Sequence, residues 1–227
     1  MIKKAPKDWA GIGDGNETWR IFRIMSEFID GFEVLSQVGD AVSIFGSARA
    51  KRNSENYKLA ERIAFLLAQE GYTIITGGGP GIMEAANKGA KKAKGLSIGL
   101  NIRLPEEQKP NPYTDILLEF RYFFARKVMF VKYAKAFVVL PGGFGTLDEF
   151  IEAITLIQTQ RIDSFPVILV KHKFWKPIIN WMEKTLVPEG MIDQEDLDIF
   201  TVVDSPEDVI EIIRDFYAEK RAQILDR

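Results

Sequence analysis

Short apolar runs alternate with amphipathic segments along most of the chain. Strands that are apolar throughout are buried on both faces of a sheet, so the runs predict a parallel sheet of about seven strands. These strands are expected at residues 41–46, 72–76, 96–102, 116–120, 136–140, 166–170 and 199–203. Between them, apolar residues recur at helical spacing. Helices are therefore expected at residues 57–69, 82–93, 121–133, 146–160, 174–186 and 206–220, the last with Ser205 as its N-cap.

The order of these elements predicts the architecture. Strands that alternate with helices are joined by right-handed crossovers, which place helices on both faces of the sheet. The result is an α/β fold, a Rossmann-like, doubly wound parallel sheet. A chain of 227 residues can bury a substantial core, and it has no internal repeat or break in composition. We therefore expect one nucleotide-binding domain over residues 17–227.

A further helix is expected before the first strand, over residues 17–38. Its apolar residues recur at three- and four-residue steps, as in an amphipathic helix. They are Trp19, Phe22, Met25, Phe28, Ile29, Phe32 and Leu35. Large apolar side chains are usually buried, so this stripe is interpreted as a packing surface. Residues 1–16 are rich in Lys, Gly, Asp and Pro and are expected to form a flexible leader.

Composition narrows the range of functions. The chain is 46% hydrophobic and 27% charged, with a net charge of −2, which argues against nucleic acid as a main partner. It has no cysteine, so disulfides, thiolate metal sites and cysteine nucleophiles are excluded. The N-terminus lacks the apolar core of a signal peptide, and no apolar run is long enough to cross a bilayer. We expect a cytoplasmic protein without a membrane partner.

Three glycine-bearing turns follow predicted strands, at residues 46–49, 77–81 and 141–146. Ligands of doubly wound sheets bind at the carboxyl ends of the strands, where these turns meet. In the third turn, a strand leads through glycines into a helix that is expected to begin at Thr146. Free N–H groups and the helix dipole at such a start favour a phosphate. Thr146 and Glu149 also fit a capping box, which would explain both residues without any ligand.

Several common phosphate-binding chemistries lack their motifs. The dinucleotide fingerprint G-x-G-x-x-G is absent, because the first turn reads GSARA and the richer GGGPG turn follows the second strand. The Walker lysine motif is absent as well, so phosphoryl transfer has no support. The single histidine, His172, is expected in a surface loop, and no metal site can be read.

Arg126 and Glu149 are the remaining candidates for chemistry. Glu149 closely follows the third glycine turn, and Arg126 lies among apolar and aromatic residues of the preceding helix. A carboxylate beside a bound nucleotide, with an arginine near its phosphate, suits cleavage of an N-glycosidic bond through an oxocarbenium-like transition state. The alternative is that Arg126 is an ordinary solvated or ion-paired side chain.

Two motifs carry a family resemblance. GGGPGIMEAANKGA (77–90) and PGGFGTLDE (141–149) resemble the signature motifs of the LOG (Lonely Guy) family, and Arg126-Lys127 matches its arginine-lysine pair. The resemblance runs from about Val42 to Ile168. Members are cytokinin-activating phosphoribohydrolases, long labelled "possible lysine decarboxylase". The resemblance implies hydrolysis of a nucleoside 5′-monophosphate to free base and ribose 5-phosphate by a homodimer or higher homo-oligomer. We expect no cofactor.

The resemblance also implies roles for individual residues. It makes Arg126 and Glu149 catalytic. It assigns the 5′-phosphate to Gly142, Gly143, Gly145 and Thr146, and the rest of the nucleotide site to Gly46, Ser47, Gly79, Gly81, Met83 and Lys127.

This chain departs from the shortest plant-type members, and the added N-terminal helix resembles the longer bacterial branch. It has Phe123-Phe124-Ala125 where they carry a histidine before the arginine-lysine pair, and Glu84 where they carry a glycine. AMP and N6-substituted AMP (a cytokinin ribotide) therefore both remain as substrates. The alternative function is a non-catalytic nucleotide or molybdenum-cofactor carrier on the same fold. Lysine decarboxylation is rejected, because no lysine stands in a recognisable pyridoxal-phosphate setting.

Overall fold

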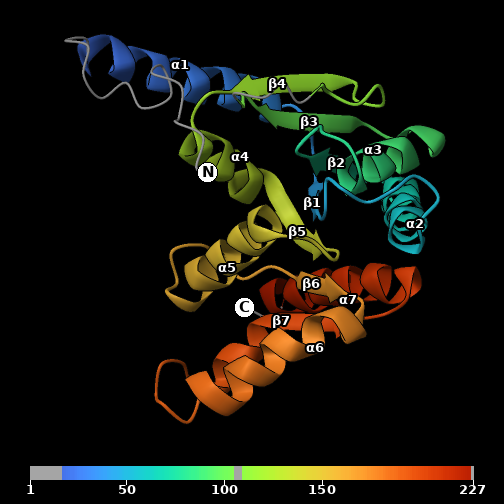
Figure 1. Cartoon of the computed structure of the whole chain (residues 1–227), viewed down its shortest axis with the longest axis vertical. Helices are drawn as coiled ribbons and strands as arrows, with labels where there is room; N and C mark the ends of the chain where they lie inside the picture. The colour runs from blue at the N-terminus through green and yellow to red at the C-terminus, as the bar shows by residue number, and fades with distance from the viewer. Residues whose placement is uncertain (1–16, 105–108, 226–227) are drawn as a thin grey trace, which may run out of the picture.

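The computed structural model describes residues 17–104 and 109–225 (Figure 1). The expected leader at residues 1–16 lies outside this range. The sheet has seven strands in the order β4-β3-β2-β1-β5-β6-β7, and every neighbouring pair is parallel. The predicted Rossmann-like, doubly wound fold is therefore confirmed.

The strands lie within two residues of their predicted positions, because each apolar run fills one buried crossing of the sheet. They are β1 (Ala41–Phe45), β2 (Thr73–Thr76), β3 (Ser97–Ile102), β4 (Ile116–Phe120), β5 (Ala134–Val139), β6 (Val167–Val170) and β7 (Phe200–Val203). The helices are α1 (Glu17–Leu35), α2 (Glu55–Gln69), α3 (Ile82–Lys92), α4 (Phe123–Tyr133), α5 (Phe144–Gln158), α6 (His172–Trp181) and α7 (Pro206–Leu225).

Two short helical segments change the predicted pattern. The helix α6 continues as a π-helical turn at Met182–Leu186, and a 3-10 turn at Gln194–Ile199 precedes β7 without having been predicted. Ser205 caps α7 as expected, since its hydroxyl oxygen accepts a hydrogen bond from the Asp208 N–H at 3.1 Å. Among the described residues, no helix is both long and apolar enough to span a bilayer.

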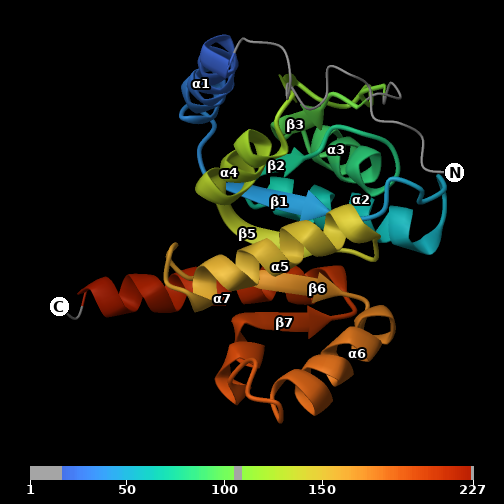
Figure 2. The same ribbon diagram turned by 60° about the vertical axis from the view of Figure 1, so that its left-hand side comes forward.

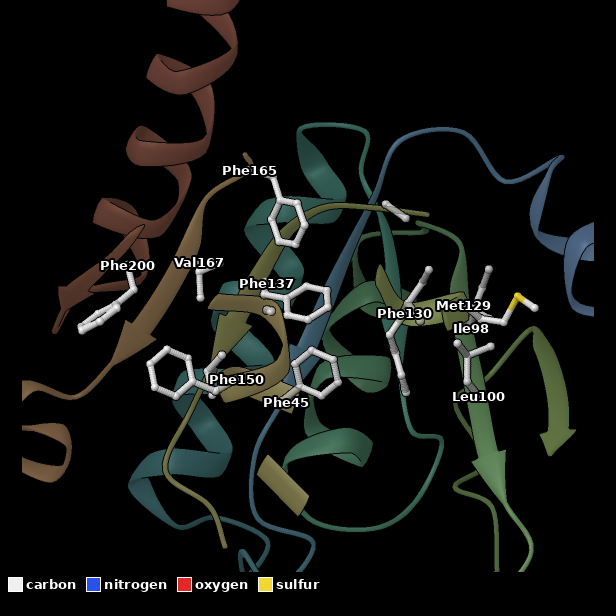
Figure 3. Close-up of a cluster of buried hydrophobic side chains, with 14 of the residues drawn as sticks. Phe45, Ile98, Leu100, Met129, Phe130, Phe137, Phe150, Phe165, Val167 and Phe200 are labelled. Atoms are coloured by element: carbon white, nitrogen blue, oxygen red, sulfur yellow. The ribbon is translucent and has the colours of Figure 1, made fainter. Parts of the chain in front are cut away.

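Side chains alternate between the two faces of the sheet. Phe45, Phe137 and Val139 face one core together with α4, α5 and α6, whereas Val42 and Ile44 face a second core with α2, α3 and α7. Figure 1 shows α4 and α5 on one side of the sheet and α2 and α3 on the other. In the first core, the Phe45 ring lies 4.9 Å from Phe130 and 4.8 Å from Phe137, both edge-on (Figure 3). These contacts fix α4 against the central strands.

The chain reverses direction across the sheet between β1 and β5. It moves outward from β1 to β4, then returns to place β5 on the other side of β1, where Phe45 pairs with Val139. The loops that leave these two strands therefore diverge, one toward α2 and one toward α5 (Figure 2). Such a divergence opens a crevice at the carboxyl edge of the sheet. The Ser47 N–H donates to the Pro141 carbonyl at 3.1 Å and joins the two loops at its base.

A buried polar network holds the second glycine turn. The Thr76 hydroxyl donates to Asn87 Oδ1 at 2.6 Å and accepts from the Gly78 N–H at 2.9 Å. The Asn111 amide donates to Asn87 Oδ1 at 2.9 Å and to the Gly79 carbonyl at 3.0 Å. Because buried polar groups are costly when unpaired, this network fixes one arrangement of the turn.

The stripe on α1 is only partly a packing surface. Leu35 is buried and Phe28 packs against the first core, but Trp19, Phe22 and Ile29 are exposed. Glu27 ties α1 to the turn that precedes α4, since its carboxylate accepts from the Arg121 N–H at 2.9 Å. The interpretation of the stripe as a packing surface therefore holds within this chain for Phe28 and Leu35 and not for its exposed members.

The close packing of α3 on α2 leads to a prediction. A Cβ atom added at Gly89 would lie 2.2 Å from the Glu61 carbonyl oxygen, so backbone has to move to admit it. We expect Gly89→Ala to lower the free energy of unfolding by about 1–3 kcal/mol in urea denaturation. Gly145→Ala is the control, because a Cβ there meets no atom within 4 Å. Equal stability of both variants would contradict this account of the packing.

Candidate active site

A cavity of about 990 Å³ opens at the carboxyl ends of β1 and β5. Its size falls within the usual range of small-molecule sites. The turn after β1, the turn after β5 and one side of α4 form its walls. Phe45, Ile102, Leu104, Phe123 and Phe130 add apolar surface. The cavity thus combines a polar floor of backbone with apolar side walls, at the place that the topology predicts for a ligand.

The helix α5 begins earlier than predicted. Gly143 is its N-cap, Phe144 is its first residue, and no side chain caps it. Thr146 lies inside the first turn, where its N–H donates to the Gly143 carbonyl at 3.0 Å. The alternative interpretation of Thr146 and Glu149 as a capping box is therefore wrong. Because Gly143 is extended, the helix can start directly after the turn, and its first N–H groups stay open toward the cavity.

Glycine is required at several points of the cavity wall. A Cβ at Gly142 would lie 2.1 Å from Thr146 Oγ1, and one at Gly46 would lie 2.7 Å from Ile82. Gly81 supports the wall from behind, because it has a φ of +70° and a Cβ there would lie 2.4 Å from the Ser47 carbonyl. These glycines therefore let the loops on both sides of the crevice pack closely against their own neighbours.

Arg126 and Glu149 lie next to each other in the cavity wall. Arg126 Nη2 lies 3.8 Å from Glu149 Oε1, and the two side chains are 14% and 4% exposed. Within the described chain, neither Glu149 oxygen nor Arg126 Nε has a hydrogen-bond partner. The guanidinium lies over the rings of Phe123 and Phe130, at 5.2 and 5.6 Å. Buried polar groups rarely lack partners, so this pair indicates a ligand that supplies them.

Burial controls the charge of this pair. It raises the pKa of Glu149 to about 7, against the opposing effect of the positive charges of Arg126 and Lys127. Burial likewise lowers the pKa of Arg126 from its usual value, against the charge of Glu149. A carboxylate that titrates near neutrality can accept a proton from water or stabilise a developing positive charge.

The structure brings nine of the twelve predicted site residues to the cavity wall. They are Gly46, Ser47, Met83, Arg126, Gly142, Gly143, Gly145, Thr146 and Glu149. Three others do not line it. Gly79 and Gly81 hold the second turn and the Ser47 loop in place, as described above. The ammonium of Lys127 lies 2.9 Å from Asp148 and 3.0 Å from Glu152, away from the cavity.

Two basic residues in the cavity wall were not predicted. Arg49 and Lys51 line the cavity from the loop after β1, and neither has an acidic partner in the described part of the chain. The loop is anchored beyond them, where Arg52 Nε donates to the buried Glu84 carboxylate at 2.8 Å. The signal was present in the sequence, since Arg49 is the last residue of the first glycine turn and Lys51 lies two residues beyond it.

Two aromatic residues at the cavity were also missed. Phe144 is 91% exposed, and Phe174 reaches the cavity from α6. No pattern in the sequence could place Phe174 there, because α6 follows a strand on the other side of β5. Among the residues that the structure describes, no group of three or more His, Asp or Glu side chains could hold a metal ion.

Comparisons with known proteins reveal relatives of this chain. Residues 83–213 match a family model described as "possible lysine decarboxylase". The cytokinin riboside 5′-monophosphate phosphoribohydrolase of Mycobacterium marinum is 26% identical over 166 residues, which cover 72% of this chain and 88% of that protein. Its namesake from Mycobacterium tuberculosis is 26% identical over 76% of this chain and 92% of that protein. An uncharacterized protein of Archaeoglobus fulgidus is 35% identical over 52% of this chain and 76% of that protein.

Solved structures share the fold. The molybdenum cofactor binding protein of Rippkaea orientalis superimposes with a TM-score of 0.58 and 27% identity, over 78% of this chain and 96% of that chain. The molybdenum cofactor carrier protein of Chlamydomonas reinhardtii has a TM-score of 0.56 and 22% identity, over 79% of this chain and 98% of that chain. The same architecture thus occurs in proteins that carry different names.

The burial of Glu149 predicts a pH-dependent cost to stability. Between about pH 4.5 and 7, the folded chain keeps a proton that the unfolded chain loses, so stability falls as pH rises. Glu149→Gln removes this loss. We expect the variant to match wild type near pH 4.5 and to be more stable at pH 8, by up to about 3 kcal/mol in urea denaturation.

Glu183→Gln, at an exposed position, is the control for the substitution itself. The same difference between Glu149→Gln and wild type at both pH values would contradict the account.

Proposed function

The chain belongs to the LOG family, and from that premise we propose that it is a nucleoside 5′-monophosphate N-ribohydrolase. Its substrate is AMP or N6-substituted AMP. Water attacks C1′ of the ribose, a C–O bond forms, and the C1′–N bond breaks. The base leaves with a proton, and ribose 5-phosphate is the second product.

One observation carries this proposal, namely the pairing of Arg126 with a buried Glu149 that has no hydrogen-bond partner. Burying a carboxylate without partners costs stability, which a bound ligand can offset, but a protein that only carries a nucleotide has no need of a carboxylate at this place. The transition state of N-glycosidic cleavage carries positive charge at C1′, which an ionised carboxylate stabilises. Glu149 must be ionised for this role and equally for activating the attacking water.

The opposite charge is available for the phosphate. The first turn of α5 presents free N–H groups beside Gly142 and Gly143, and the helix dipole adds to their attraction for an anion. Arg49 and Lys51 add positive charge on the facing loop. We assign the 5′-phosphate to this part of the cavity, the ribose to the space beside Arg126 and Glu149, and the base to the apolar walls.

Two other functions appear in the names of similar proteins, lysine decarboxylation and molybdenum-cofactor carriage, and neither is favoured over hydrolysis. A decarboxylase that uses pyridoxal phosphate needs a lysine in a defined cofactor pocket. Lys51 is the one lysine in the cavity wall over the described residues, and it is exposed. A carrier of the molybdenum cofactor would share the fold and the glycine turns, so the assay below decides between carrying and hydrolysis.

We expect the wild-type protein to release free base from AMP or from N6-isopentenyl-AMP, measured by chromatography. Glu149→Gln lowers kcat at least about 100-fold, which is the usual effect of removing an acid–base or charge-stabilising group. The same variant still binds AMP in calorimetry, because the phosphate-binding turn is intact. Glu183→Gln is the matched control and keeps full activity.

Two results would overturn the proposal. Wild-type protein that binds nucleotide but releases base from neither substrate would be a carrier. An active Glu149→Gln variant would remove the carboxylate from the reaction.

A further inference from the structure

We propose that Lys127 is a positioning residue, which holds α5 against α4 so that Glu149 faces Arg126, and that it does not bind the nucleotide. The inference rests on the proposed hydrolysis. It replaces the direct ligand contact that the family resemblance implies for this lysine.

The directions of the side chains support this role. Arg126 and Lys127 are neighbours on α4, so their side chains diverge by about 100° around the helix. Arg126 lines the cavity, whereas Lys127 does not. The Lys127 ammonium instead lies 2.9 Å from Asp148 Oδ2 and 3.0 Å from Glu152 Oε2. Two neighbouring cations of α4 thus contact α5, Arg126 inside the cavity and Lys127 outside it.

The two acidic partners of Lys127 flank Glu149 in the sequence. Asp148 and Glu152 are four residues apart and share one side of α5, and Glu149 lies between them in sequence. Neither Asp148 nor Glu152 lines the cavity. Because Lys127 binds both carboxylates, it restrains the rotation of α5 about its axis. That rotation sets the distance between Glu149 and Arg126.

The same charged groups shift the pKa of Glu149. Asp148 and Glu152 act to raise the pKa of Glu149, while Lys127 and Arg126 act to lower it. Without Lys127, the two neighbouring carboxylates would be opposed by Arg126 alone. Lys127 therefore helps to keep part of the Glu149 population ionised at neutral pH.

Only the ion pair with Asp148 is largely exposed to solvent. Lys127 is 17% exposed, but Asp148 is 53% and Glu152 is 32% exposed. A half-exposed pair contributes about 0–1 kcal/mol to folding. Glu152 Oε2 is buried, so the pair that it forms with Lys127 also stabilises the contact between the helices. Displacement of a catalytic group by about 1 Å can lower a rate about 100-fold. The contribution of Lys127 is therefore expected in the rate as well as in the unfolding free energy.

Four variants test this inference with AMP as substrate. Lys127→Met and the double variant Asp148→Asn/Glu152→Gln each break the contact from one side. Lys127→Arg restores the positive charge, and Lys132→Met is the matched control at an exposed position of the same helix. We expect the first two to lower kcat about 10- to 100-fold, with KM and the AMP affinity within about threefold of wild type. Lys127→Arg recovers most of the rate, and Lys132→Met keeps it.

The titration of Glu149, followed by carboxyl ¹³C NMR in ligand-free protein, is a readout independent of activity. Its pKa should rise in Lys127→Met and fall in Asp148→Asn/Glu152→Gln, although both variants lose rate. If wild type releases no base, the proposed function fails, and this titration alone decides the role of Lys127.

Other results overturn the inference. Weaker AMP binding in Lys127→Met, together with an unaffected double variant, would mean that Lys127 binds the nucleotide. Lower stability with unchanged kcat would make the contact purely structural. An unchanged Glu149 titration in both variants would separate Lys127 from the site.

Discussion

A buried carboxylate without a hydrogen-bond partner is the constraint on which this site depends. The Glu149 side chain is 4% exposed and lies 3.8 Å from Arg126. The nearby cation favours the ionised form of the carboxyl group, whereas burial favours its protonated form. Exposure to solvent would return the pKa of Glu149 toward its usual value, and a closer cation would favour the ionised form. The surrounding structure excludes both solvent and a closer cation from Glu149. The carboxylate is therefore available to a ligand.

The fold produces this environment from ordinary parts. Phe45, Phe130 and Phe137 fix α4 over the centre of the sheet, which places Arg126 at the edge where β1 and β5 end. Gly143 lets α5 begin directly after the glycine turn, so that Glu149 lies within the first two turns of the helix. Local stability is lost at Glu149 and recovered in the packing around it, as is common where proteins bind and react.

The sequence predicted the fold well because its signals are local. Each strand is a separate apolar run, and their separation by helices requires crossovers of one hand. The place of the cavity was predictable, since the glycine turns at the strand ends line it. Its details depend on three-dimensional packing. The capping-box alternative failed because Gly143, and not Thr146, precedes the helix. The direction of Lys127 depends on how α4 faces α5, and the contribution of Phe174 depends on the position of α6, which a linear pattern does not contain.

The pH dependence of kcat/KM for base release from AMP tests the central claim most directly, because it reports the groups that titrate in free enzyme and free substrate. A Glu149 pKa of about 7 predicts that kcat/KM at pH 6 is at least about tenfold below its plateau. The second ionisation of the substrate phosphate, near pH 6, would account for only about a twofold loss. A value at pH 6 within about twofold of the plateau would contradict the claim that a buried, partly protonated Glu149 performs the reaction.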